Sequence, residues 1–90
     1  MWQYEFSKDS IKILEKLDSA TADLLKSRIK SIGVWLAGEG SLHADIKKLK
    51  GKWEGFYRLR VREVRVIFIF DERKKLIRIH EIGFRSDIYK

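Results

Sequence analysis

The chain has 90 residues and a net charge of +7, and it contains no cysteine and no proline, with 44% hydrophobic and 37% charged residues. These values predict one small domain, residues 1–90, and they exclude disulfide bonds, thiol catalysis and thiolate metal sites. Since no apolar run approaches the roughly 20 residues of a membrane-spanning helix, we expect a cytoplasmic protein with no membrane partner.

The first half of the chain predicts one strand and two helices. Aromatic residues alternate with polar ones from Trp2 to Phe6, as in a half-buried strand. Ser7 or Asp9 can cap a helix that ends near residues 18–19, and a second helix is expected over residues 20–36. Each helix has one apolar stripe, formed by Ile11, Leu14 and Leu17 in the first and by Leu25, Ile29, Ile32 and Leu36 in the second.

The second half predicts an antiparallel meander. Residues 56–61, 64–70 and 76–82 are runs of β-branched and aromatic residues separated by polar turns. Adding the N-terminal strand at an edge gives a mostly antiparallel sheet, and the two helices, as an antiparallel hairpin, cover one of its faces. The expected fold class is therefore α+β, in the order N-terminal strand, helical hairpin and three-stranded antiparallel meander.

A two-residue loop at positions 62–63 would sort the side chains of the flanking strands into an apolar face and a basic face. With this loop, Arg60 lies opposite Arg65. Alternation places seven apolar residues on the face toward the helices: Tyr57, Leu59, Val61, Val64, Val66, Phe68 and Phe70. The other face then carries Arg58, Arg60 and Arg65.

Three arginines on one small face require a counter-charge. Like charges directly opposite each other destabilise a sheet by roughly 0.2–1 kcal/mol. An anion bound between the guanidinium groups removes this repulsion, and arginine suits the bidentate recognition of a phosphate. The alternative is that Glu54, Glu63 or Glu81 neutralises the arginines through surface salt bridges.

Positive charge is concentrated in the second half of the chain. Residues 1–45 hold six Lys and Arg against seven acidic residues, whereas residues 46–90 hold fourteen against six. This asymmetry indicates an anionic partner, and charge alone does not choose among a nucleic acid, an anionic membrane surface and an acidic protein. Four lysines are interpreted as RNA-binding contacts along a nucleic-acid backbone, or alternatively as a solubilising run: Lys47, Lys48, Lys50 and Lys52.

Three ring side chains of the basic half have both a functional and a structural interpretation. Trp53 and Phe56 can stack on bases or cover the sheet. His80 is a candidate general acid, or a surface histidine that contacts a partner. Because His43 forms no recognisable ligand pair with His80, we expect no metal and no cofactor.

Four segments of the chain form a recognisable combination. They are residues 47–51 (Lys-Lys-Leu-Lys-Gly), 56–61 (Phe-Tyr-Arg-Leu-Arg-Val), 65–68 (Arg-Val-Ile-Phe) and 82–89 (Ile-Gly-Phe-Arg-Ser-Asp-Ile-Tyr). Together they resemble the RelE/ParE toxin superfamily of bacterial and archaeal type II toxin–antitoxin systems. The resemblance covers nearly the whole chain and implies the RelE-like microbial ribonuclease fold, whose order of elements matches the one expected above.

For a RelE-type member, the resemblance implies a ribosome-dependent endoribonuclease that cuts messenger RNA and so inhibits translation. A ribose 2′-hydroxyl attacks the adjacent phosphate without a metal. By position, Arg58 and Arg60 match basic residues that bind RNA and help to activate the 2′-hydroxyl. Arg65 and Arg85 match residues that stabilise the phosphate in the transition state. Tyr89 matches a tyrosine that stacks on or orients the cleaved nucleotide.

The resemblance also implies a cognate antitoxin, expected to be an acidic, partly disordered segment that folds over the basic face. Two other functions stay open: a ParE-type poison of DNA gyrase that performs no chemistry, and a non-catalytic RNA-binding remnant. The combination of Arg65, Arg85 and Tyr89 with two basic residues on the preceding strand favours the nuclease.

The sequence departs from the family pattern at the hairpin. Arg62-Glu63-Val64 replaces the usual Gly-Asp-Tyr, so the glycine that relaxes the turn is absent. Arg58 and Arg60 stand where some active members have lysine, and an arginine side chain is a poor general base. The sequence therefore leaves the proton acceptor of the reaction unassigned.

Overall fold

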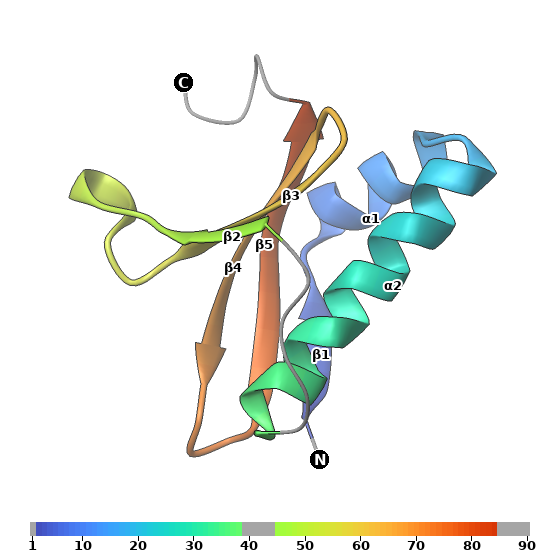
Figure 1. Cartoon of the computed structure of the whole chain (residues 1–90). Coiled ribbons are helices and arrows are strands. Elements are labelled where there is room, and N and C mark those ends of the chain that lie inside the picture. The colour runs from blue at the N-terminus through green and yellow to red at the C-terminus, as the bar shows by residue number, and fades with distance from the viewer. Residues whose placement is uncertain (1, 39–44, 85–90) are drawn as a thin grey trace.

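In the computed structural model, which describes residues 2–38 and 45–84, two helices lie against one face of a five-stranded sheet (Figure 1). The strands are β1 (Gln3–Phe6), β2 (Asp45–Lys48), β3 (Tyr57–Val61), β4 (Val64–Asp71) and β5 (Leu76–Phe84). The helices are α1 (Lys8–Lys16), α2 (Ser19–Leu36) and a short 3-10 helix, η1 (Gly51–Trp53). The strand order is β1-β5-β4-β3-β2, with β1 parallel to β5 and the other neighbours antiparallel. The α+β prediction, with the N-terminal strand at an edge, is confirmed.

Strand β2 was not predicted from the sequence. Its four residues contain one apolar side chain, Ile46, and therefore give no alternation that distinguishes them from a polar loop. The strand exists because its backbone pairs antiparallel with β3, where Lys47 lies opposite Arg58. As a result, β3 is an inner strand, and its arginines project from the interior of the sheet rather than from its edge.

The turn between β3 and β4 has the predicted two-residue loop. Val61 pairs with Val64, and the register that follows from this pair is the predicted one. Arg62 adopts a left-handed backbone with φ of +56°, a conformation that costs a residue with a Cβ about 1–2 kcal/mol. Arg62 Nη1 donates a hydrogen bond to Thr21 Oγ1 at 3.2 Å, so the side chain that replaces the family's glycine ties the turn to the start of α2.

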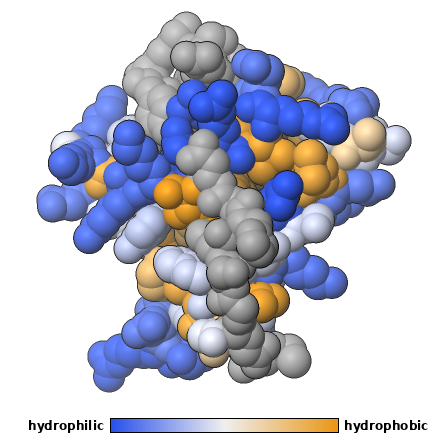
Figure 2. All heavy atoms as spheres, viewed as in Figure 1, coloured by the Kyte–Doolittle hydropathy of each residue, from blue (hydrophilic) through white to orange (hydrophobic). Residues whose placement is uncertain are grey.

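The core lies between the helices and the sheet face that they cover. Leu25, Ile29 and Ile32 of α2, from the predicted stripe, are at most 3% exposed. They pack with eight buried residues of the sheet: Leu59, Val61, Val64, Val66, Phe68, Ile77, Ile79 and Ile82. Hydrophilic side chains dominate the surface visible in Figure 2, as expected when the apolar faces of both layers meet inside.

Helix α1 departs from its predicted apolar stripe at one position. Ile11, expected in the buried stripe, is 44% exposed, whereas Ser10 is fully buried. The buried hydroxyl is satisfied because Ser10 Oγ donates to the Ser7 carbonyl oxygen at 2.8 Å. Leu14 and Leu17 do pack against the core. The stripe prediction was wrong at Ile11 because hydrophobicity alone does not show that a serine can bury its hydroxyl in a local hydrogen bond.

Tyr4 joins β1 to α2. Its hydroxyl lies 2.9 Å from the Ile29 carbonyl oxygen and 3.0 Å from that of Lys30, and it accepts a hydrogen bond from Gly33 N at 3.1 Å. A Cβ on Gly33 would lie 2.7 Å from the Tyr4 hydroxyl oxygen, so this close approach requires glycine. Burial raises the pKa of the Tyr4 phenol, and the hydrogen bond from Gly33 partly opposes the rise.

Asp18 is the N-cap of α2 and accepts a hydrogen bond from Thr21 N at 3.1 Å. Hydrogen bonding to Thr21, with a smaller contribution from the charge of Arg62, lowers the pKa of Asp18 below its ordinary value of 3.8. Because the folded-state pKa is the lower one, the ionised carboxylate stabilises the fold above that ordinary value. This contribution is lost as the pH falls through the lowered pKa.

We predict that Gly33→Ala lowers the free energy of unfolding by about 1 kcal/mol or more, although alanine favours a helix over glycine by about 1 kcal/mol. The added methyl group displaces the Tyr4 hydroxyl, whose hydrogen bonds contribute about 1 kcal/mol each. In a Tyr4→Phe background the clash is absent, and Gly33→Ala should be neutral or stabilising. Urea unfolding of the four proteins measures the coupling. An equal effect in both backgrounds would contradict this account.

For Asp18→Asn, which keeps an oxygen acceptor but removes the charge, we predict a pH-dependent loss of stability. The native protein should be more stable than the variant at about pH 6, and the difference should shrink at about pH 3. Urea unfolding of both proteins at the two pH values tests this. A difference that does not change with pH would show that the lowered pKa of Asp18 has no part in stability.

Candidate nucleic-acid interface

The face of the sheet opposite the helices carries the predicted arginines, and we call it the arginine face. Arg60 pairs with Arg65, as predicted. Arg58 pairs with Ile67 of β4 on one side and with Lys47 of β2 on the other. Arg60 is exposed, whereas Arg58 and Arg65 are half-buried. The structure therefore brings together three guanidinium groups and one ammonium group on a single surface, as a site for a phosphate requires.

A β-bulge in β5 adds two further polar residues to the arginine face. Ile67 pairs with Glu81 and Phe68 pairs with Ile79, so His80 is the extra residue between the two pairs. The carbonyl oxygen of His80 accepts a hydrogen bond from Ser7 Oγ at 2.8 Å. The residue that caps α1 is thus also bonded to the bulge, and the position of the bulge is linked to that of the helix.

The ring of His80 belongs to an aromatic cluster at one end of the arginine face. Its centroid lies 5.3 Å from that of Phe56 and 5.7 Å from that of Trp53, and the latter two rings meet edge to face at 5.5 Å. Trp53 and Phe56 are half-buried and His80 is exposed. These mutual contacts match the interpretation that Trp53 and Phe56 cover the sheet, and they direct the His80 ring toward the aromatic residues. Base stacking and general acid catalysis stay predictions for these residues.

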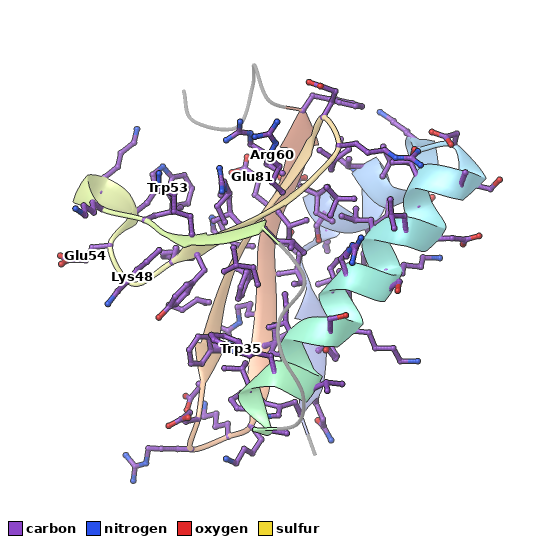
Figure 3. All side chains as sticks on the ribbon, in the orientation of Figure 1. Trp35, Lys48, Trp53, Glu54, Arg60 and Glu81 are labelled. Atoms are coloured by element: carbon purple, nitrogen blue, oxygen red, sulfur yellow. The ribbon has the colours of Figure 1, made fainter. Side chains whose placement is uncertain are left out.

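The four lysines of the predicted basic run are all exposed, but they do not share one face. Lys47 lies opposite Arg58 and therefore on the arginine face. Lys48 lies opposite Tyr57, whose side chain faces the helices, and Figure 3 shows Lys48 directed away from Arg60. Lys50 precedes η1 and Lys52 lies within it. Of the four, Lys47 is the one that extends the arginine face, and the others place positive charge around the end of the sheet.

Of the three acidic residues considered as counter-charges to the arginines, one lies on the arginine face. Glu63 is exposed in the turn after β3, and Glu54 is exposed beyond η1, where Figure 3 shows it far from Arg60. Glu81 is half-buried on the arginine face, in the same row of paired residues as Arg58. On this face Arg78 Nε forms an ion pair with Glu5 Oε1 at 3.0 Å, at the β1 side of the sheet.

Two of the predicted site residues, Arg85 and Tyr89, lie outside the described residues, as does His43. Within residues 2–38 and 45–84, no group of three or more His, Asp or Glu residues is arranged to hold a metal ion. In the same part of the chain, neither of the long helices is apolar enough to cross a lipid bilayer. The described part of the arginine face carries guanidinium and ammonium groups together with the side chains of Glu81 and His80.

Comparison with known proteins places the chain in a family. A family model, described as the ParE toxin of a type II toxin-antitoxin system, parDE, matches residues 4–89. The structure is similar to one chain of the RelB-RelE antitoxin-toxin complex from Methanococcus jannaschii, with 25% identity, 94% of each chain covered and a TM-score of 0.72. It is also similar to one chain of the archaeal RelE-RelB complex from Pyrococcus horikoshii, with 25% identity, 97% and 98% covered and a TM-score of 0.68.

A third similar structure is the YoeB-YefM complex from Staphylococcus aureus. The likeness has 21% identity, a TM-score of 0.73, and covers 94% of this chain and 98% of that one. At this identity it supports the fold alone. A search of curated protein sequences gave no significant match.

We predict that the arginine face binds single-stranded RNA with an affinity that falls as salt rises, with a log–log slope of about −0.7 for each phosphate contacted. Arg60→Ala should make the slope shallower by about 0.7. Lys26→Ala, which removes the same charge from an exposed position on α2, should leave the slope unchanged. Fluorescence anisotropy on an RNA with 2′-O-methyl riboses gives the slopes. Equal effects of the two variants would mean that net charge, rather than this face, binds RNA.

Proposed function

We propose that the chain, which belongs to the family of ParE toxins of type II toxin–antitoxin systems because the family model matches residues 4–89, is an endoribonuclease that cuts messenger RNA and inhibits translation. The observation that carries the proposal is the placement of Arg58, Arg60 and Arg65 on one sheet face, next to Lys47. We propose that the protein acts in the cytoplasm, on messenger RNA held by the ribosome.

The proposed reaction is attack of a ribose 2′-oxygen on the adjacent phosphorus. Negative charge grows on the phosphoryl oxygens in the transition state, and fixed guanidinium groups stabilise it most where water is excluded. Arg65 is half-buried on β4, the middle strand of the sheet, and suits this role. Arg58 and Arg60 on the neighbouring strand hold the RNA backbone on either side, which aligns the attacking oxygen with the phosphorus. No step of this scheme needs a metal ion.

We further propose a cognate antitoxin as the protein partner. The similar structures from Methanococcus jannaschii and Pyrococcus horikoshii are complexes of a RelE chain with a RelB chain. The arginine face suits an acidic segment, because binding such a segment relieves the repulsion among the arginines and covers the surface that RNA needs. An antitoxin of this kind would compete directly with RNA.

A second candidate function is a ParE-type poison of DNA gyrase that performs no chemistry. The observation that favours it is that the matching family model is the ParE model. The two functions make different demands on the arginine face, because a gyrase poison needs binding alone whereas the nuclease also needs transition-state stabilisation.

We predict that the protein makes discrete cuts within the reading frame of a messenger RNA in a reconstituted translation reaction. Arg65→Ala should lower the rate of cutting by about 10²- to 10³-fold, as removal of one preorganised donor to a developing anion does. Arg73→Ala, at an exposed position in the turn after β4, is the matched control and should cut like the native protein. Primer extension on the message reads out position and rate.

An intact message at a protein concentration that stops growth would contradict the nuclease. In that case, DNA cleavage by purified gyrase in the presence of the protein tests the second function. Accumulation of gyrase–DNA cleavage complexes would establish it.

A further inference from the structure

The proposed reaction needs a group that removes the proton of the 2′-hydroxyl, and the three arginines cannot supply it, since arginine stays protonated in proteins. We infer that Glu81 is this general base. The inference rests on the proposed ribonuclease function and assigns the one step that the arginines leave open. In the sequence, Glu81 is considered only as a counter-charge to the arginines. Its position in the sheet is the basis for assigning it as the general base.

Glu81 lies within reach of a phosphate held by the arginines. It pairs with Ile67, which pairs with Arg58 on its other side, so Glu81 and Arg58 are two strand spacings apart, about 10 Å between Cα atoms. Arg65 is the diagonal neighbour of Glu81, at roughly 7–8 Å. Long guanidinium side chains and a shorter carboxylate at these spacings can converge on one nucleotide. Figure 3 shows Glu81 and Arg60 on the same part of the sheet.

The bulge at His80 is what puts Glu81 on the arginine face. Ile77 and Ile79 point into the core and are fully buried. With unbroken alternation, Glu81 would be the next residue to point into the core, which is a costly position for a carboxylate. The extra residue shifts the alternation, so Glu81 joins the arginine face and Ile82 enters the core at 3% exposure. The hydrogen bond from Ser7 Oγ to the His80 carbonyl oxygen holds the bulge at this point.

Two other acidic residues have backbone positions near the arginine face. Glu5 is engaged with Arg78 at 3.0 Å. Asp45 has its register position opposite Arg60 on β2, the outermost strand of the sheet. Glu81 lies between these two, half-buried beside the fully buried Ile67. An apolar floor of this kind lowers the local dielectric constant and strengthens interactions with charge that develops during the reaction.

The step balances as follows. The carboxylate of Glu81 takes the proton of the 2′-hydroxyl while the 2′-oxygen forms a bond to phosphorus. The bond from phosphorus to the 5′-oxygen of the next nucleotide breaks, and that oxygen takes a proton from water. The products are a 2′,3′-cyclic phosphate and a 5′-hydroxyl, and Glu81 returns its proton to solvent.

Glu81→Gln tests the inference against Glu5→Gln, which makes the same change on the same face at an exposed ion pair of little energetic value. Single-turnover cutting of a message on programmed ribosomes gives the rate. Protection of a message with 2′-O-methyl riboses, which the protein cannot cut, gives the affinity. We expect Glu81→Gln to cut about 10²- to 10⁴-fold more slowly while binding at least as tightly, because a negative charge has been removed. Glu5→Gln should cut at the native rate, and it should also bind at least as tightly, because it removes the same charge from the same face.

Three results would overturn the inference, and they can be told apart. If Glu81→Gln cuts at the native rate, the base is another group and the nuclease function stands. If Glu81→Gln loses affinity in proportion to its rate, Glu81 shapes the face and transfers no proton. If the native protein itself does not cut, the proposed function fails and the role of Glu81 fails with it.

Discussion

The pairing of β3 with β4 determines what each face of the sheet carries. Side chains alternate along a strand, so a shift of one residue between the two strands would exchange their faces. In the observed register Leu59 pairs with Val66 inside the core, and Arg60 pairs with Arg65 outside. The same set of backbone hydrogen bonds therefore buries the apolar residues and gathers the arginines. A fold that buries this core cannot avoid placing these like charges together.

A second constraint comes from the contact between α1 and β5. Ser7 caps α1 by accepting a hydrogen bond from Ser10 N at 3.1 Å, and its hydroxyl donates to the His80 carbonyl oxygen. The Ser7 hydroxyl thus bonds both to a backbone N–H in the first turn of α1 and to the backbone carbonyl oxygen at the bulge of β5. Because the bulge decides on which face Glu81 lies, a contact in the helical layer influences the chemistry of the opposite face of the sheet.

The parts of this structure that could be predicted are those that a repeating pattern determines. The period-two runs gave the hairpin register and the three arginines, and the α2 stripe gave the centre of the core. Strand β2 could not be predicted, because its sequence has one apolar residue and no alternation. It is a strand through its backbone pairing with β3, which its own sequence does not show. In α1, Ser10 is buried where Ile11 was expected to be, because the Ser10 hydroxyl makes a hydrogen bond at the start of the helix. Glu81 was one of three acidic residues considered as counter-charges, and alternation from Ile79 could not place it on the arginine face, because its position there depends on the bulge.

The arginine face is a compromise between stability and binding. Arg60 opposite Arg65 disfavours the folded state by an amount of the order of 0.2–1 kcal/mol, as like charges in a sheet do. A ligand that binds only the folded state raises the free energy of unfolding, and the increase grows with the logarithm of the ligand concentration divided by its dissociation constant. The positive charge of this face therefore favours an anionic ligand, whether that ligand is the RNA backbone or an acidic segment of an antitoxin. Glu81 is half-buried on the same face, in the same row of paired residues as Arg58. The bulge of β5 thus places a carboxylate among these cations, where the proposed reaction needs a proton acceptor.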